Sequence, residues 1–269
     1  MRRLLPLLLL LAGCAPAAGQ RGGGIVSLNP CSDQLLLALV PAERIAAISH
    51  YSQAAGATSM PLDVARRFRT TGGTAEEVIA LAPDLVVATS YTPPATRAAF
   101  ERAGLRTLYL DSPTTIAGSK AQVAVLAAAV GASGQGMAIN ARIDRALAEA
   151  RWTGAQVPAL LYISGDLATG DGTLLHEMMQ MAGLRNAAAD YGLALTGTLP
   201  VETILAHPPA LILRPDAEGR TAAIRRRLLA RTDAGTQEVA FPRELINCGG
   251  PTIPAALARL ATVRRQVAP

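Results

Sequence analysis

Short, largely apolar runs alternate with segments of helical spacing along most of the chain. The runs lie at residues 25–28, 44–48, 107–110 and 159–163. Strands that are buried on both faces of a parallel sheet are continuously apolar, and helices cover such a sheet. The pattern therefore predicts an α/β fold with mostly parallel sheets. Residues 164–173, which contain three glycines, are expected to form a loop.

One unit of this pattern occurs twice. Residues 74–87 begin with a threonine cap and continue through a short helix and a proline turn to an apolar strand, and residues 200–213 repeat the unit. Glu76 and Glu202 each come seven residues before a proline, and they are 126 residues apart. The duplication predicts two similar lobes with something held between them.

The middle of the chain has no strand pattern. Residues 116–130 and 133–151 have helical spacing, with Ile139 and Ile143 on one face of the second helix. A helical stretch of this length between two α/β halves predicts a connector. We therefore expect an N-terminal α/β lobe at residues 25–112, connector helices at 113–152 and a C-terminal α/β lobe at 153–269.

The N-terminus has the pattern of a secretory signal. Two arginines precede an apolar run at residues 4–11, and small residues follow. The run is far shorter than the ~20 residues that a membrane-spanning helix needs. We expect a signal peptide at residues 1–13, and a tether rich in Gly, Ala and Pro at residues 14–24.

The sequence Leu-Ala-Gly-Cys at residues 11–14 resembles the bacterial lipobox. That resemblance implies cleavage before Cys14 and acylation of its thiol. The protein would then be exported to the periplasm and attached to a membrane only through its lipid. The alternative is an ordinary secretion signal with a chance cysteine.

The charge of the chain argues against a nucleic-acid partner. Removing Arg2 and Arg3 with the signal reduces the formal net charge from +5 to +3. No lysine or arginine run has interleaved aromatic residues, and we expect residues 225–227 to form a solvated helix face. Half of the residues are apolar, which is typical of a globular protein and not of a disordered one.

Two cysteines remain beside Cys14. Cys31 and Cys248 could form a disulfide in an oxidising compartment, stay as free thiols or share a metal ion. Cys31 comes at a helix start, where a thiolate would be stabilised. A thiol enzyme that uses Cys31 is therefore conceivable. No accompanying His/Asp arrangement supports it, so we do not expect an enzyme.

Four motifs are spread over residues 25–263. Together their order and spacing resemble the periplasmic-binding family of bacterial ABC importers for iron–siderophores, haem and cobalamin. The resemblance implies two Rossmann-like lobes joined by a long connector helix, a ligand cleft between the lobes and only a small opening motion. The motifs are Ile-Val-Ser-Leu-Asn-Pro at 25–30, Ala-Pro-Asp-Leu-Val at 82–86, Gly-Thr-Leu-Leu at 172–175 with Ala-Gly-Leu-Arg-Asn at 182–186, and Cys-Gly-Gly-Pro at 248–251.

The repeated glutamates acquire a role from this resemblance. In the family, carboxylates at the positions of Glu76 and Glu202 face the transporter and pair with its arginines. One docking charge on each lobe would suit a permease dimer that binds a monomeric partner. The alternative is that each glutamate only favours a helix N-terminus.

Several residues in predicted cleft-edge loops are candidates for ligand binding. Tyr51, in a context similar to the family's Ser-Tyr-Ser, could stack on a planar ligand or meet a metal, and His50 could be an axial ligand or an ordinary loop histidine. Arg214 could meet a ligand carboxylate or phosphate, or form a surface ion pair. The full candidate set is Asn29, Pro30, Cys31, His50, Tyr51, Tyr91, Arg214 and Cys248.

These features predict the solute-binding component of an ABC importer, without a cofactor of its own, for a ferric siderophore or a corrinoid or haem-like ligand. Cobalamin is less favoured, because cobalamin binders of this type have tryptophans near the positions of Thr71 and Thr196. An exported sensor or storage domain of the same fold is the alternative, and a thiol enzyme using Cys31 is the third.

Overall fold

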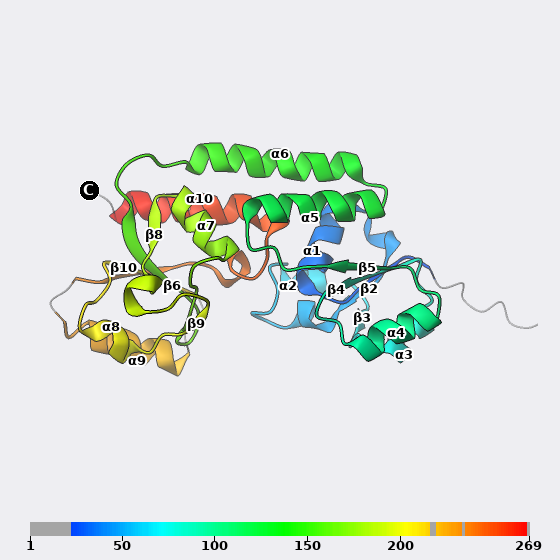
Figure 1. Cartoon of the computed structure of the whole chain (residues 1–269), viewed down its shortest axis with the longest axis horizontal. Coiled ribbons are helices and arrows are strands. Elements are labelled where there is room, and N and C mark those ends of the chain that lie inside the picture. The colour runs from blue at the N-terminus through cyan, green and yellow to red at the C-terminus, as the bar shows by residue number, and fades with distance from the viewer. Residues whose placement is uncertain (1–22, 216–218, 233–234, 268–269) are drawn as a thin grey trace, which may run out of the picture.

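The computed structural model describes residues 23–215, 219–232 and 235–267. Within them the chain forms two β-sheets on opposite sides of the molecule, beneath a layer of long helices (Figure 1). This arrangement confirms the predicted two-lobed α/β fold. The predicted signal peptide, Cys14 and most of the predicted tether lie outside the described residues. None of the described helices is long and apolar enough to cross a membrane.

The first sheet has five strands, all parallel, in the order β3-β2-β1-β4-β5. Ile25 and Val87 belong to the core that also contains residues of helices α1 and α5, whereas Val26 and Val86 pack on the opposite face with Phe100 of helix α4. Both faces are covered, which is why the strands are apolar throughout. The elements are β1 (Ile25–Ser27), α1 (Pro30–Leu39), η1 (Ala42–Arg44), β2 (Ile45–Ser49), η2 (His50–Gln53), α2 (Leu62–Ala65), β3 (Thr70–Thr71), α3 (Ala75–Ala80), β4 (Leu85–Thr89), α4 (Pro94–Arg102) and β5 (Thr107–Leu110).

The second sheet has the order β11-β10-β6-β7-β9, and β8 also pairs with β6. Strands β11, β10, β6 and β8 are parallel, whereas β7 runs antiparallel to β6 and β9. The elements are β6 (Val157–Ser164), β7 (Leu167–Ala168), α7 (Leu174–Met181), β8 (Leu184–Asn186), η3 (Ala188–Tyr191), β9 (Gly197–Thr198), α8 (Val201–Leu205), β10 (Leu211–Arg214), α9 (Arg220–Leu229), β11 (Gln237–Ala240), η4 (Arg243–Leu245) and η5 (Gly250–Thr252).

The prediction of a loop at residues 164–173 is partly wrong, because Leu167 and Ala168 form strand β7. Gly165 has φ of +53° and turns the chain tightly from β6 into β7. Two residues of pairing are too few to leave a periodic signal in the sequence, so the hairpin could not be recognised there.

Three long helices form the layer above both sheets. Helix α6 (Ser133–Ala150) packs against α5 (Ile116–Ala129), beside the first sheet, and against α10 (Ile253–Val267), beside the second (Figure 1). At Gly136 the helices α5 and α6 approach so closely that an added Cβ would lie 2.5 Å from the Cβ of Ala127. The predicted connector is thus a pair of helices, while the exact lobe boundaries stay predictions.

The two copies of the repeat fold alike. The first copy forms helix α3 and strand β4, and the second forms helix α8 and strand β10. Strand β4 lies beside β1, the first strand of its lobe, and β10 lies beside β6, the first strand of the other lobe. The predicted duplication of an α/β unit is confirmed.

Asp33 ties helix α1 to the end of strand β2. Its side chain is fully buried, and Oδ2 accepts hydrogen bonds from Ser52 Oγ at 2.6 Å and from Ser49 N at 3.0 Å. Burial raises the pKa of Asp33 to about 7, against the opposing effect of the hydrogen bonds from Ser52 and Ser49. Below that pH, the carboxyl group of Asp33 is therefore mainly protonated and neutral in the folded protein.

We expect Asp33→Asn to change how stability depends on pH. Because the pKa is about 7 in the folded state and about 3.9 when unfolded, only the unfolded chain loses this proton between about pH 4 and pH 7. Wild-type stability should therefore fall across this window by a few kcal/mol relative to the variant. Thermal unfolding across the window measures the difference.

Asp63→Asn serves as the control, because Asp63 has 73% of its side chain exposed. Its melting temperature should follow that of the wild type at every pH. If the Asp33→Asn and wild-type curves run parallel, Asp33 does not hold its proton in the folded state.

Candidate functional site

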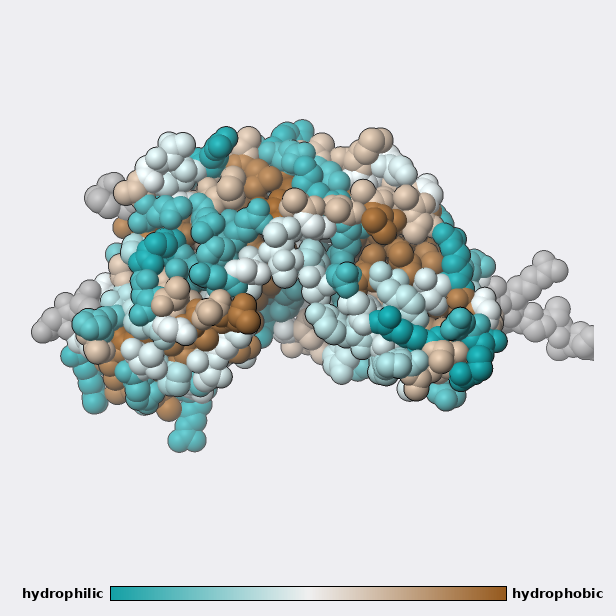
Figure 2. Space-filling model, viewed as in Figure 1, coloured by the Kyte–Doolittle hydropathy of each residue, from teal (hydrophilic) through white to brown (hydrophobic). Residues whose placement is uncertain are grey.

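A cavity of about 210 Å³ lies between the two lobes. Its walls come from the carboxyl ends of strands in both sheets, where open α/β sheets bind their ligands. Figure 2 shows the molecule hollowed between its two halves, with mainly white and teal residues around the hollow. The lining residues at or just after strand ends include Asn29, Thr89, Leu110, Asp111 and Ser112 from the first lobe, and Ile163 and Thr169 from the second, whereas Thr196 comes directly before β9.

Most polar groups in the lining are hydroxyls and amides. Asp111 is the single ionisable side chain among the lining residues, and none of them is aromatic. Asp111 and Ser112 are not among the residues predicted from the sequence. Both directly follow the predicted strand at residues 107–110, so the rule that ligands gather at the carboxyl ends of parallel strands could have found them.

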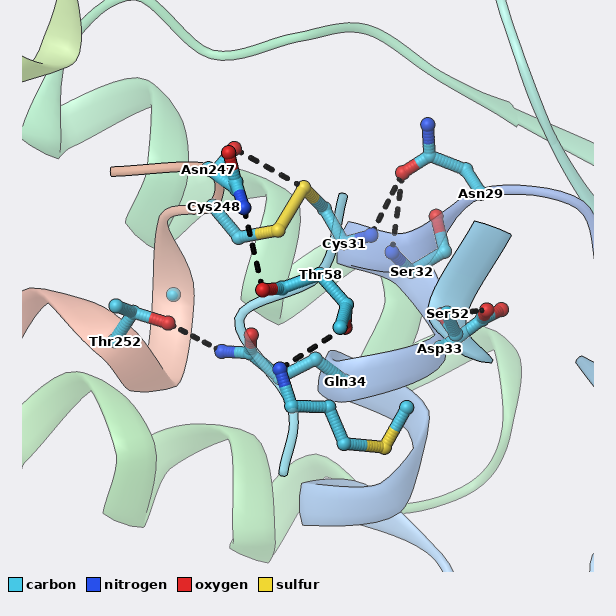
Figure 3. Close-up of a disulfide and its surroundings, with 12 residues drawn as sticks. Asn29, Cys31, Ser32, Asp33, Gln34, Ser52, Thr58, Asn247, Cys248 and Thr252 are labelled. Carbon is cyan, nitrogen blue, oxygen red and sulfur yellow. Dashed lines mark hydrogen bonds between the residues drawn. A yellow bond between two sulfur atoms is a disulfide. The ribbon is translucent and has the colours of Figure 1, made fainter. Parts of the chain in front are cut away.

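The start of helix α1 forms part of the cavity wall. Asn29 caps this helix, because its Oδ1 accepts hydrogen bonds from Cys31 N at 2.8 Å and from Ser32 N at 3.4 Å (Figure 3). Pro30 occupies the first helical position, where its missing N–H and fixed φ are favourable. The Asn-Pro-Cys sequence thus directs the Asn29 amide and the Cys31 sulfur to the cavity, while Pro30 does not line it.

A disulfide joins Cys31 to Cys248, with their Cα atoms 5.3 Å apart (Figure 3). Both cysteines line the cavity, and the bond links helix α1 of the first lobe to the segment before η5 of the second. Of the three states that the sequence left open, the disulfide is the one that the structure contains. Cys31 in this form has no thiolate, so the thiol-enzyme hypothesis loses its nucleophile.

Polar contacts reinforce this link between the lobes. Asn247 Nδ2 donates to the carbonyl oxygens of Gly56 and Thr58 at 3.2 Å, and Gln34 Nε2 donates to Thr252 Oγ1 at 2.5 Å. Asn247 O is also 3.4 Å from Cys31 Sγ, which has no proton to donate once it is bonded to Cys248. These partners are up to 218 residues apart in the chain, and nothing in the sequence pattern predicts them.

The cavity lining does not include His50, Tyr51 or Tyr91. His50 Nδ1 is 3.3 Å from Thr71 O, and its ring centroid is 4.0 Å from that of Tyr51. Tyr51 is 56% exposed and Tyr91 is 79% exposed. They follow strands β2 and β4, so they lie at the same edge of the sheet as the cavity and remain accessible.

Arg214 lies at the end of strand β10 and is not among the cavity-lining residues. Its Nε is 3.4 Å from Glu238 Oε2, and both side chains are mostly buried. The alternative from the sequence was a surface ion pair; the structure has an ion pair, but a mostly buried one, and it engages the guanidinium within the second lobe.

Most of the described chain matches one protein family. A family model described as "Periplasmic binding protein" matches residues 25–239. The chain belongs to this family. No curated protein sequence matches it.

Solved structures with the same fold cover almost the whole of this periplasmic binding protein. The periplasmic heme-binding protein RhuT from Roseiflexus sp. RS-1 has 24% identity and a TM-score of 0.73, and the alignment covers 92% of this chain and 100% of that one. A periplasmic heme-binding protein from Pseudomonas aeruginosa has 21% identity, a TM-score of 0.71 and coverages of 91% and 94%. The vitamin B12 binding protein BtuF of Vibrio cholerae has 16% identity, a TM-score of 0.70 and coverages of 91% and 97%.

The two repeated glutamates of this binding protein are solvent-exposed. Glu76 lies in the first turn of α3 and Glu202 in the first turn of α8, and both helices lie on the side of the molecule opposite α6 (Figure 1). In α3 the local structural role belongs to Glu77, which accepts hydrogen bonds from Thr71 Oγ1 at 2.8 Å and Gly72 N at 2.6 Å. These bonds lower the pKa of Glu77.

Protein side chains in the described ranges do not form a metal site by themselves: no group of three or more His, Cys, Asp or Glu residues is suitably clustered.

We expect the disulfide to stabilise this binding protein. The bond closes a loop of more than 200 residues, and such a link restricts the unfolded chain. Replacing both cysteines, as in Cys31→Ser with Cys248→Ser, should lower the melting temperature by roughly 5–15 °C.

Thermal unfolding with and without a reductant checks this. The reductant should lower the melting temperature of the wild type and leave that of the double variant unchanged. Equal melting temperatures for the oxidised wild type and the double variant would contradict a stabilising link.

Proposed function

We propose that this periplasmic binding protein is the solute-binding component of an ABC importer. It captures a metal chelate or tetrapyrrole, namely a ferric siderophore, a corrinoid or a haem, between its lobes and delivers it to a permease. The observation that carries the proposal is the cavity at the carboxyl ends of both sheets, to which both lobes contribute. The similar solved structures are named as heme-binding or vitamin B12 binding proteins, and these names support this ligand class.

The cavity between the lobes takes only part of such a ligand. Its volume of about 210 Å³ is below the ~300–1,000 Å³ typical of sites that bury a drug-sized molecule. The rest of a chelate would occupy the open hollow next to it. The exposed rings of Tyr51 and Tyr91, which follow strands β2 and β4, would be available to stack on a planar ligand, and His50 beside Tyr51 is a candidate metal ligand.

The proposal includes export and a lipid anchor. Cleavage before Cys14 would leave its thiol for acylation, and the tether would then connect the lipid to residue 25. The binding protein would work as a monomer on the membrane surface, where the concentration of its permease is high.

Docking uses one carboxylate from each lobe. Glu76 and Glu202 are exposed in equivalent first turns, and neither makes a hydrogen bond or ion pair within the described residues. Charge-assisted pairs between these carboxylates and arginines of the permease would be directional and strong. An exported sensor or storage domain without a transporter remains the second candidate, and it has no need of these two charges.

Ligand binding is tested by thermal shift. Ferric siderophores, haem and cobalamin are each added to the purified protein at increasing concentration. At about 100 times its dissociation constant, the true ligand should stabilise the fold by about 2.7 kcal/mol, which raises the melting temperature by roughly 5–10 °C. Absence of a shift with every chelate would refute a chelate-binding function.

Docking is tested by reversing both charges. We expect Glu76→Lys with Glu202→Lys to reduce uptake through the cognate permease by about tenfold or more, because like charges then face each other. The affinity for the ligand in solution should be unchanged.

The matched control is Glu43→Lys with Glu149→Lys, which makes the same change in net charge at exposed positions in η1 and α6. Uptake should be normal in this control. Normal uptake in the Glu76/Glu202 variant as well would favour the sensor or storage function.

A further inference from the structure

The charges around the interlobe cavity indicate what kind of chelate it accepts. Among the residues that the structure describes, the cavity lining contains no lysine, arginine or histidine. Its one ionisable side chain is Asp111, which is exposed directly after strand β5. An anionic group of a ligand would therefore meet a carboxylate and no cation.

Backbone N–H groups at helix starts could replace a cation, since they bind anions well. Three helices begin near the cavity, and in each of them side-chain oxygens already accept hydrogen bonds from one or two of the first N–H groups. Asn29 accepts from residues 31 and 32 of α1, and Thr173 Oγ1 accepts from His176 N of α7 at 3.1 Å. In α5, Thr115 Oγ1 accepts from Gly118 N at 2.9 Å, and Glu177 Oε2 accepts from Ile116 N at 2.6 Å.

Cations on nearby segments are also engaged. Arg97 donates to Thr92 O at 2.9 Å and to Ser90 O, and its guanidinium lies 4.4 Å from the Tyr109 ring centroid. His176 Nδ1 is 3.1 Å from Asp171 Oδ1. To meet a ligand anion, each would first have to give up its present partners.

Neutral polar groups, in contrast, find partners in the cavity. Asn29 uses only its Oδ1 for capping, so its amide nitrogen is available, and Figure 3 shows that nitrogen directed away from helix α1. The hydroxyls of Thr89, Ser112 and Thr196 also line the cavity. Hydroxyls both donate and accept, so this set matches ligand amides and hydroxyls.

We propose that this cleft selects a neutral or positively charged chelate whose amide, hydroxyl or amine groups enter the cavity between the lobes, and that it discriminates against anionic chelates. The inference rests on the proposed function and narrows its ligand class. A carboxylate buried in the cavity would lose its water without gaining a cationic partner. A cationic group could pair with Asp111.

Matched ligands of one scaffold test the proposal by isothermal titration calorimetry. Cyanocobalamin is compared with its monocarboxylic acid, in which one peripheral amide has become a carboxylate. Ferrioxamine B, which carries a free amine, is compared with its N-acetyl and N-succinyl derivatives. In the scaffold that binds, the uncharged or cationic member should bind about tenfold or more tightly than the carboxylate member.

Asp111→Asn tests the source of this selectivity. Removal of the Asp111 carboxylate should reduce the ratio of the binding affinities of the neutral and anionic members at least ~3-fold, because its repulsion of the ligand carboxylate at close range is lost. Glu149→Gln, an exposed residue of α6 with the same change in charge, should leave the ratio unchanged.

The outcomes distinguish a failure of this inference alone from a failure of the proposed function. Equal or tighter binding of the carboxylate member, or binding only of haem or ferric enterobactin with their anionic groups, would overturn the inference and leave the function standing. If no chelate of any charge binds, the proposed function fails and the inference fails with it.

Discussion

A single hydrophobic core runs beneath helices α5, α6 and α10 and contains residues of both sheets. Leu85 and Val87 of the first sheet share it with Leu161 and Leu213 of the second, and Ile139 and Ile143 of α6 lie within it. Close-packed interiors resist deformation, so the lobes cannot separate without breaking this core. The disulfide and the polar contacts near Cys248 add a second connection below it. The spacing of the cleft walls therefore follows from burial of the helix layer.

Much of this fold could be predicted from local periodicity. The apolar runs, the repeated α/β unit and the connector helices each span enough residues to leave a pattern. The two-residue strand β7 does not. Its antiparallel pairing depends on a turn at Gly165 and on contacts with β9, which lies about 30 residues further along the chain. Where an element is short and stabilised by distant partners, sequence patterns carry little information.

The candidate site was less predictable than the fold. Asn29 and the two cysteines were found through motifs, but the proximity of Cys31 to Cys248 spans 217 residues and depends on how the lobes pack. Arg214 was a reasonable candidate by type and position, yet its contact with Glu238 arises from pairing of β10 with β11. Residue chemistry suggests which groups could act, whereas tertiary packing decides which of them are already engaged.

The rigid spacing and the polarity of the cleft act together. A flexible cleft could move a cation toward a ligand anion, but walls fixed by a shared core and a disulfide offer mainly the groups already facing the cavity. Here side-chain caps occupy some of the N–H groups at the starts of α1, α5 and α7, and internal partners hold Arg97 and His176. Specificity is a difference between affinities. A preorganised cavity wall can thus favour a neutral ligand over an anionic one in two ways. It provides hydrogen-bond partners for the neutral ligand, and within the described part of the chain it lacks free cationic groups that could pair with an anion.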